Sequence, residues 1–178
     1  MSELRDKNGL TEEEFLKQYN SDGWKKPSLT ADICIITKAG DVQKILLIRR
    51  GNHPCLGKWA TPGGFSEEGE CIENTAAREL EEETSIKMDA KELTLVGVYS
   101  KPGRDPRGWT VSVAFAAVVD ADKVKPIAAD DAADAKWFTI SKTGDTYSFS
   151  ADNETITLDE LAFDHADIVT DALNKVNA

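Results

Sequence analysis

The chain has 178 residues, of which 40% are hydrophobic and 30% charged, and its formal net charge is −11 at pH 7. A chain of this length is expected to form one domain with a substantial core. The acidic balance argues against a general nucleic-acid-binding protein, because phosphate contacts rely on clustered Lys and Arg. The sequence has no apolar run of membrane-spanning length and no hydrophobic signal-peptide region near its start. We therefore predict a cytoplasmic protein with no membrane partner.

The first predicted element is a short helix that opens with a capping box formed by Thr11 and Glu14. A linker follows, in which Trp24 is expected to pack against the rest of the protein, and a role in lining a base-binding surface is the alternative. We predict that residues 1–28 form an N-terminal helix and linker, and that residues 29–178 form a single domain.

Two short apolar runs follow, at residues 32–37 and 44–50, and both are rich in β-branched residues. A turn separates them, which predicts a hairpin of buried strands. The second run ends in two arginines, Arg49 and Arg50. Such a pair is usually solvated, but one member could reach a substrate phosphate, and Arg49 is the candidate.

A glycine-rich loop with Gly63 and Gly64 leads into a predicted helix over residues 71–84, which contains no Pro or Gly. At about 100° per residue, its apolar residues fall along one stripe that is expected to face the core. These residues are Ile72, Ala76 and Leu80.

Three glutamates share one flank of this helix beside the apolar stripe: Glu79, Glu82 and Glu83. Glu81 points away from them. A solvated charged face is the usual interpretation of a Glu-rich helix, but like charges beside a buried stripe repel one another unless a cation neutralises them. Mg²⁺ takes oxygen ligands and binds carboxylates together with substrate phosphates. The pattern therefore predicts a carboxylate site for Mg²⁺.

The spacing of Gly64, Glu70 and the run from Arg78 to Ile86 resembles the Nudix box of the Nudix hydrolases. Every position matches except Ser85, which stands where the family has glycine. The resemblance implies an α/β fold, the Nudix α/β/α sandwich with a mixed central sheet. It also implies hydrolysis of a nucleoside diphosphate linked to another group, with Mg²⁺ or Mn²⁺ as the cofactor. Glycine would permit a left-handed helix end that serine adopts at some cost, so we expect a small distortion and no loss of chemistry.

Carried over position by position, the resemblance assigns three carboxylates to the metal: Glu79, Glu82 and Glu83. The Gly63 carbonyl is a further candidate ligand. Arg78 would orient the carboxylates through a charge-assisted bond to Glu70 or Glu82. The resemblance thereby places Arg78, Glu79 and Glu82 among the catalytic candidates.

Two strands are predicted at residues 93–100 and 110–120, and the loop between them carries Arg104, Arg107 and Trp109. These side chains could hold phosphate and stack a base or ribose. A plain surface connection is the alternative, because the loop contains several Gly and Pro. The loop resembles a segment that ADP-ribose-type Nudix proteins carry after the box. That resemblance makes ADP-ribose the leading small-molecule substrate, cleaved to AMP and ribose 5-phosphate.

An acidic segment with Asp130 and Asp131 precedes a predicted strand at residues 136–140. In the family, such a loop often faces the metal site, where a carboxylate could deprotonate the attacking water or bind another metal ion. Asp131 is the first candidate, and a solvated acidic turn is the alternative. A hairpin and a C-terminal helix complete the chain, with Asp164 as the predicted N-cap and His165 as a structural residue.

Two alternatives to this enzyme stay open. Related proteins use a Nudix domain to sense ADP-ribose and carry a DNA-binding winged helix after it. Because the chain ends at Ala178 soon after the last helix, and because the box is nearly complete, we expect hydrolysis and no nucleic-acid partner. The other alternative is a Nudix enzyme acting on an oxidised nucleoside triphosphate or another sugar nucleotide. By analogy with ADP-ribose-type Nudix enzymes, the chain could form a homodimer.

Overall fold

The computed structural model describes residues 4–39, 42–120 and 132–177. Within these ranges the strands form one sheet in the order β5-β6-β1-β2-β7-β8-β9, with β3 paired to β2 and β4 paired to β1. The strands are β1 (Ser28–Ala39), β2 (Val42–Arg50), β3 (Trp59–Ala60), β4 (Gly63–Phe65), β5 (Thr94–Tyr99), β6 (Thr110–Val119), β7 (Ala132–Thr143), β8 (Thr146–Ala151) and β9 (Glu154–Thr157). The helices are α1 (Glu12–Gln18), α2 (Ile72–Thr84) and α3 (His165–Val176), and short 3₁₀ helices lie at Ser21–Gly23, Ala90–Glu92 and Leu158–Glu160.

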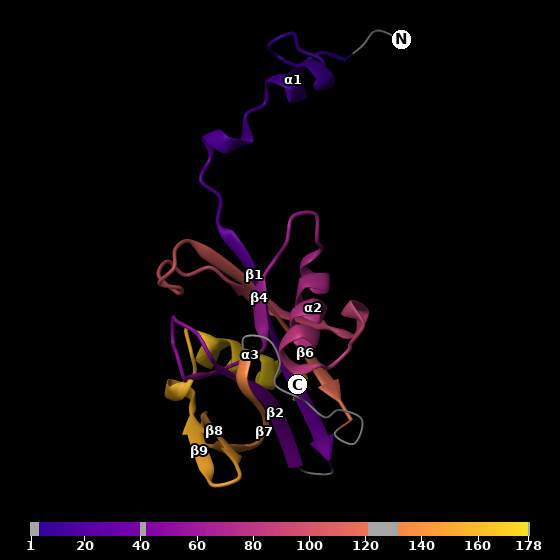
Figure 1. The fold of residues 1–178 in the computed structure, drawn as a ribbon. Helices are drawn as coiled ribbons and strands as arrows, with labels where there is room; N and C mark the ends of the chain where they lie inside the picture. The colour runs from indigo at the N-terminus through magenta and orange to yellow at the C-terminus, as the bar shows by residue number, and fades with distance from the viewer. Residues whose placement is uncertain (1–3, 40–41, 121–131, 178) are drawn as a thin grey trace.

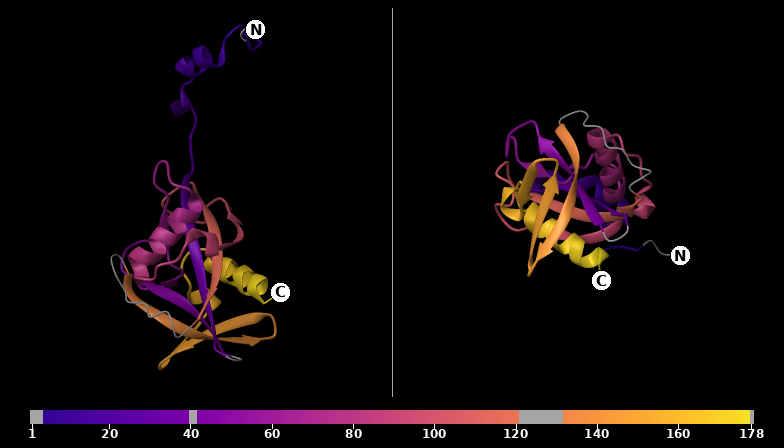
Figure 2. Two further views of the ribbon diagram at one scale, coloured as in Figure 1. Left: turned by 90° about the vertical axis from the view of Figure 1, so that its right-hand side faces the viewer. Right: turned by 90° about the horizontal axis from the view of Figure 1, so that it is seen from below.

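Helix α2 covers one face of the sheet and α3 covers the other (Figure 1, Figure 2). Successive side chains of a strand point to opposite faces, and β1 shows this arrangement directly. Ile33 packs in one buried cluster with Leu80 of α2. Its neighbour Cys34 packs in another cluster with Ile168 of α3. The apolar run of β1 does not alternate because both faces are buried, and the predicted α/β/α sandwich is confirmed.

The sheet is mixed because β1 pairs in parallel with β6 but antiparallel with β2 and β4. Strand β1 is longer than the apolar run at 32–37 because its first residues pair with both β4 and β6. This register sets Asp32 opposite Gly63 of β4. A charged side chain therefore enters the sheet next to the glycine loop.

Helix α2 agrees with the predicted box helix, and its inward residues Ala76 and Leu80 are fully buried. The helix ends at Ser85, whose φ of 61° and ψ of 15° are left-handed, as the glycine of the box pattern would favour. The Ser85 N–H donates to the Glu81 carbonyl at 2.8 Å and so caps the helix. None of the helices in the described ranges combines the length and the apolar character needed to cross a membrane.

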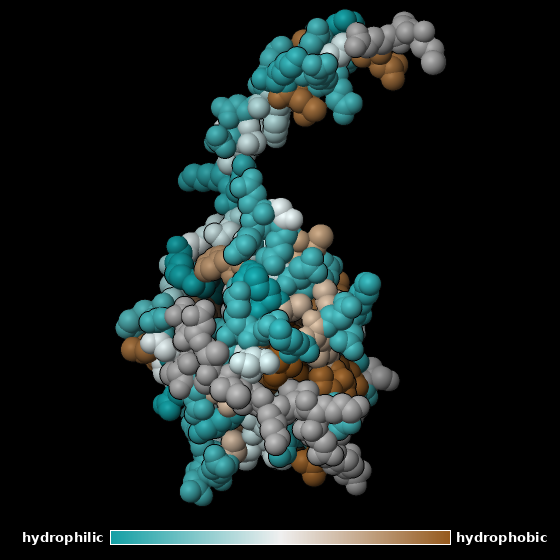
Figure 3. Space-filling view, turned by 45° about the vertical axis from the view of Figure 1, so that its right-hand side comes forward, coloured by the Kyte–Doolittle hydropathy of each residue, from teal (hydrophilic) through white to brown (hydrophobic). Residues whose placement is uncertain are grey.

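The N-terminal arm runs away from the sheet, and α1 buries none of its side chains (Figure 1, Figure 2). The predicted capping box of Thr11 and Glu14 is present. Hydrophobic side chains lie on the surface of the arm (Figure 3). Phe15 and Leu16 are among the exposed hydrophobic residues of this segment. Trp24 is 72% exposed, so the prediction that it packs against the protein is wrong. The reason is that the residues before β1 extend away from the sheet (Figure 1), so Trp24 has no surface among the described residues to pack against.

Candidate active site

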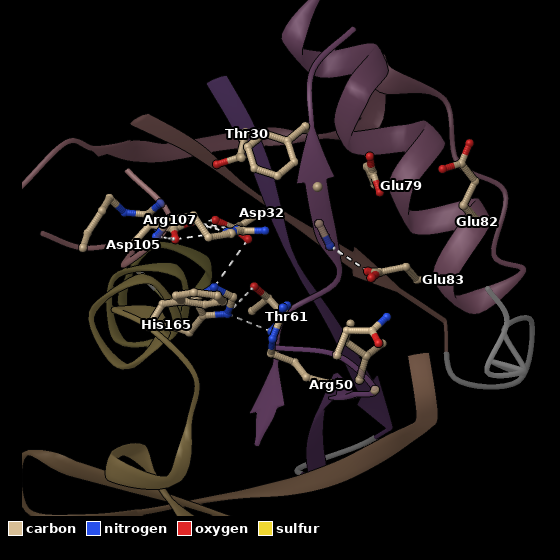
Figure 4. A pocket seen from close by; sticks show the side chains of 18 residues that line it. Thr30, Asp32, Arg50, Thr61, Glu79, Glu82, Glu83, Asp105, Arg107 and His165 are labelled. Atoms are coloured by element: carbon tan, nitrogen blue, oxygen red, sulfur yellow. Dashed lines mark hydrogen bonds and ion pairs between the residues drawn. The ribbon is translucent and has the colours of Figure 1, made fainter. Parts of the chain in front are cut away.

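A cavity of about 380 Å³ lies between α2 and the start of α3. Its walls come from β1, the end of β2, the β3–β4 loop, α2, the β5–β6 loop and the first residues of α3 (Figure 4). This volume is in the range of small-molecule sites. The side chains that reach the cavity therefore come from segments far apart in the sequence.

The glutamates of α2 form one side of the cavity, where Glu79, Glu82 and Glu83 all line it (Figure 4). Arg78 holds two of them, because its Nη1 donates to Glu79 at 2.8 Å and to Glu82 at 3.0 Å. Its Nε and Nη2 donate to Glu70, each at 3.1 Å. These hydrogen bonds lower the pKa of Glu70 to about 2. Arg78 thus makes both of the carboxylate contacts that the box pattern suggested.

Glu83 is the most strongly perturbed member of this cluster. Its Oε2 accepts the backbone N–H of Gly63 at 2.9 Å. Burial raises the pKa of Glu83 to about 8, and the nearby charges of Glu79 and Asp32 act in the same direction. Burial also raises the pKa of Glu79. These carboxylates therefore face one another in a poorly solvated place, where a cation would relieve their repulsion.

The donor set fits a hard divalent cation, because it consists of carboxylate and backbone oxygens. Among the residues described, however, no three His, Cys, Asp or Glu side chains already converge closely enough to hold a metal ion. Instead, Arg78 donates hydrogen bonds to Glu79 and Glu82, and the Gly63 N–H donates one to Glu83. Gly64 provides the room for this cluster, since a Cβ there would overlap the Glu79 carboxylate. Each carboxylate uses only one of its two oxygens in these bonds, so its other oxygen can bind a cation when the three side chains turn toward one another.

A partly buried ion pair supports the opposite wall of the cavity. Arg104 donates from Nε and Nη2 to the two carboxylate oxygens of Asp164, at 2.8 and 2.6 Å. Its Nη2 also lies 3.8 Å from Asp32, which accepts the Ser112 hydroxyl. Asp164 occupies the predicted N-cap position of α3 but makes no capping bond, because its carboxylate is taken by Arg104. Arg104 lines the cavity, but its Nε and Nη2 already donate to the Asp164 carboxylate.

His165 connects the start of α3 to the glycine loop. Its Nδ1 accepts the Thr61 backbone N–H at 3.1 Å, so the ring proton lies on Nε2, which is 3.5 Å from Asp32. Burial lowers the pKa of His165, which keeps the ring neutral. These contacts agree with the structural role predicted for His165, although the ring also borders the cavity.

The structure brings only some of the predicted substrate-binding residues to the cavity. Arg104 and Arg107 line it, as does Arg50. Arg49 donates instead to the Gly57 carbonyl at 3.1 Å, away from the cavity lining. Trp109 is 58% exposed and does not belong to the lining either.

The cavity-wall residues that sequence reasoning does not assign to the site include Asp32, Arg50, Phe65 and Phe163. Asp32 carries a usable signal, since a charge that opens an apolar strand is rarely buried without partners. No sequence pattern marks Phe65 and Phe163 as site residues, because only folding brings their two segments together. The proposed proton acceptors Asp130 and Asp131 lie outside the described residues.

Comparison with known proteins gives three informative matches beyond the NUDIX domain family, which matches residues 26–158. An ADP-ribose pyrophosphatase from Methanocaldococcus jannaschii is 40% identical over 134 residues, which cover 75% of this chain and 68% of that protein. The ADPR responsive transcriptional repressor NtrR from Acinetobacter baylyi is 32% identical over 172 residues. That match covers 96% of this chain but 62% of the repressor, so the chain spans less than two thirds of its length. The NUDIX domain of Shewanella oneidensis NrtR, solved with ADP ribose, superposes with a TM-score of 0.72 at 29% identity, over 94% of this chain and 99% of that one.

Proposed function

The chain belongs to the Nudix family of hydrolases, and from this premise we propose that it cleaves the pyrophosphate of ADP-ribose to give AMP and ribose 5-phosphate. The observation that carries the proposal is the cavity itself. The glutamates of the box helix line one side of it, and arginines from two other segments line the rest. Similarity to an ADP-ribose pyrophosphatase supports this choice of substrate.

Mg²⁺ is the proposed cofactor, with Mn²⁺ as a substitute. Glu79, Glu82 and Glu83 would hold it, with the Gly63 carbonyl as a further ligand. When bound, the cation neutralises phosphate charge and makes phosphorus more susceptible to attack. Such neutralisation is needed here, because a protein with a net charge of −11 and an anionic substrate repel each other.

Residues around the cavity orient the three glutamates and supply positive charge for the substrate. Arg78 fixes Glu79 and Glu82, and the Gly63 N–H fixes Glu83. Arg50 is a cavity cation close enough to Glu83 to lower the pKa of that carboxyl, and we assign it to a substrate phosphate. Arg104, already bonded to Asp164, supports the wall instead.

Hydrolysis also needs a proton acceptor. A bond forms between the water oxygen and phosphorus, the bond from phosphorus to the bridging oxygen breaks, and the water gives up a proton. Asp131, with Asp130 as the second candidate, is our proposed acceptor. A cytoplasmic location and a homodimeric state stay predictions.

A sensor is the second candidate function. The similarity to an ADPR responsive repressor extends over 96% of this chain, which favours a protein that binds ADP-ribose without cleaving it. The two functions differ in their products. A sensor would bind ADP-ribose tightly and release neither AMP nor ribose 5-phosphate.

Product analysis separates these functions. The protein is incubated with Mg²⁺ and ADP-ribose, other sugar nucleotides or oxidised nucleoside triphosphates, and the products are resolved by chromatography. We expect AMP and ribose 5-phosphate in equal amounts from ADP-ribose, at a higher rate than from the other compounds. Glu82→Gln should reduce turnover by orders of magnitude without changing thermal unfolding.

Glu81→Gln is the matched control, because Glu81 lies on the same helix but pairs with Lys87 at 2.8 Å and does not line the cavity. This variant should retain wild-type turnover. Unchanged activity in Glu82→Gln would refute the role of the glutamate cluster. Binding of ADP-ribose without products would favour the sensor.

A further inference from the structure

Three side chains from three separate segments form one wall of the cavity, which we call the aromatic wall: Phe65, Arg107 and Phe163. Phe65 ends β4, Arg107 belongs to the β5–β6 loop, and Phe163 precedes α3. The guanidinium carbon of Arg107 lies 4.7 Å from the centroid of the Phe65 ring. It lies 5.6 Å from the centroid of the Phe163 ring. The guanidinium plane and both rings are thus gathered in one place.

Arg107 is held in this position by Asp105, whose side chain is 2% exposed. The Arg107 Nε and Nη2 donate to this carboxylate at 3.1 and 2.7 Å. Asp105 also accepts the backbone N–H of Arg107 at 2.9 Å. An arginine that grips phosphate presents this fork of donors to its ligand. Here Asp105 occupies part of the fork, and the guanidinium lies over the rings of Phe65 and Phe163, so Arg107 joins the two rings into one surface.

The aromatic wall begins beside the glutamate cluster, where the Phe65 carbonyl accepts a hydrogen bond from Arg78 at 2.9 Å, and extends away from it. Arg107 and Asp105 stand on the opposite side of the cavity from Glu79 and Glu82 (Figure 4). Phe65 is 42% exposed, so part of its ring remains open to a ligand. A group that reaches from the glutamates across the cavity would meet a surface of two aromatic rings and a guanidinium.

We propose that the aromatic wall of Phe65, Arg107 and Phe163 is a stacking site for the nucleobase of the substrate. A nucleobase has a flat π-face that stacks on aromatic rings and on arginine, whereas a ribose has no such plane. The wall takes the stacking role that the sequence suggested for Trp109, which does not line the cavity. This inference rests on the proposed function only for which nucleotide binds. The stacking of a base on the wall does not depend on it.

Calorimetric titration with two ligands tests the inference without requiring turnover. AMP carries the base, and ribose 5-phosphate carries a sugar and a phosphate but no base. The variants are Arg107→Lys, which keeps the charge and removes the plane, and Phe65→Leu, which keeps an apolar side chain and removes the ring. Each should raise the Kd for AMP about tenfold and leave the Kd for ribose 5-phosphate unchanged.

The N-terminal arm supplies matched controls. Arg5 is also paired with a carboxylate, Glu14, at 3.1 Å, and Phe15 is another partly exposed ring. Arg5→Lys and Phe15→Leu should therefore bind AMP like the wild type. Phe65→Tyr, which retains the ring, should also keep the wild-type affinity, and this rescue separates stacking from a general loss of structure.

Three results would overturn the inference. The first is that Arg107→Lys and Phe65→Leu both bind AMP with wild-type affinity. The second is that these variants lose affinity for ribose 5-phosphate instead of AMP. The third is that the wild-type protein shows no measurable binding of AMP. The proposed function fails separately. A protein whose wall variants lose AMP affinity, but which releases no products from ADP-ribose, would retain the stacking site and lose the hydrolase assignment.

Discussion

Replacing Gly64 by alanine tests whether the close approach of β4 to α2 sets the position of the glutamate cluster. A Cβ at this position would overlap the carboxylate of Glu79. The backbone of Gly64 is not left-handed, so alanine adds no conformational strain of its own. The effect of the substitution must therefore come from the contact with Glu79.

The expected size of this effect follows from the bond that Glu79 would lose. The carboxylate is the end of a flexible side chain and can turn away, but it then gives up its 2.8 Å hydrogen bond from Arg78. A hydrogen bond to a charged group contributes about 1.5–3 kcal/mol, and partial exposure of Arg78 favours the lower end. For a chain of this length, a loss of about 1.5 kcal/mol lowers Tm by about 3–6 °C. Displacing a metal-binding carboxylate by about 1 Å should reduce turnover about 100-fold.

The assay compares thermal unfolding and initial rates of ADP-ribose hydrolysis in four variants: Gly64→Ala, Glu79→Ala, the double variant and Gly23→Ala. Gly23→Ala is the control, because a Cβ there meets nothing within 4 Å. In the Glu79→Ala background, Gly64→Ala should cost no further stability, since the clashing carboxylate is gone. Wild-type Tm and turnover in Gly64→Ala, or strictly additive losses in the double variant, would refute this account.

Three further predictions concern stability. Burial gives folded Glu83 a pKa of about 8 against an ordinary value of 4.5, so its ionisation weakens the metal-free fold as pH rises from 4.5 to 8. Glu83→Gln should therefore raise Tm in EDTA at pH 8.5 but not at pH 4, and an equal difference at both pH values would contradict this. Ser85→Gly should raise the free energy of unfolding, measured in urea, by about 0.5–1 kcal/mol, because Ser85 has a φ of 61°; a decrease would argue against strain there. Arg104→Met leaves the partly buried Asp164 without its partner and should cost about 3 kcal/mol in the same assay. The double variant Arg104→Met/Asp164→Leu should restore most of this loss, and equal losses in the two variants would disprove the pairing.

The parts of the site that the sequence reveals are those encoded by local spacing. Glu79, Glu82 and Glu83 share a face because the helical repeat brings residues three and four apart together. Arg78 reaches Glu82 for the same reason. The two apolar runs at the start of the domain likewise predict the central strands without reference to the rest of the chain.

The parts that escape sequence reasoning depend on register and on distant loops. Arg49 and Arg50 are adjacent, and only the pairing of β2 with its neighbours decides which of them faces the cavity. A shift in the register of β2 and β7 falls between these two residues. Arg104 and Asp164 are 60 positions apart, so no local pattern indicates that they bond. The aromatic wall likewise exists only where three segments distant in sequence meet.

Anomalous diffraction at the manganese edge, from crystals grown with Mn²⁺ and AMP, tests most directly whether the glutamates of α2 bind the divalent ion. We expect an anomalous peak about 2 Å from carboxylate oxygens of Glu79, Glu82 and Glu83. A map with no anomalous peak among these three carboxylates would contradict the assignment.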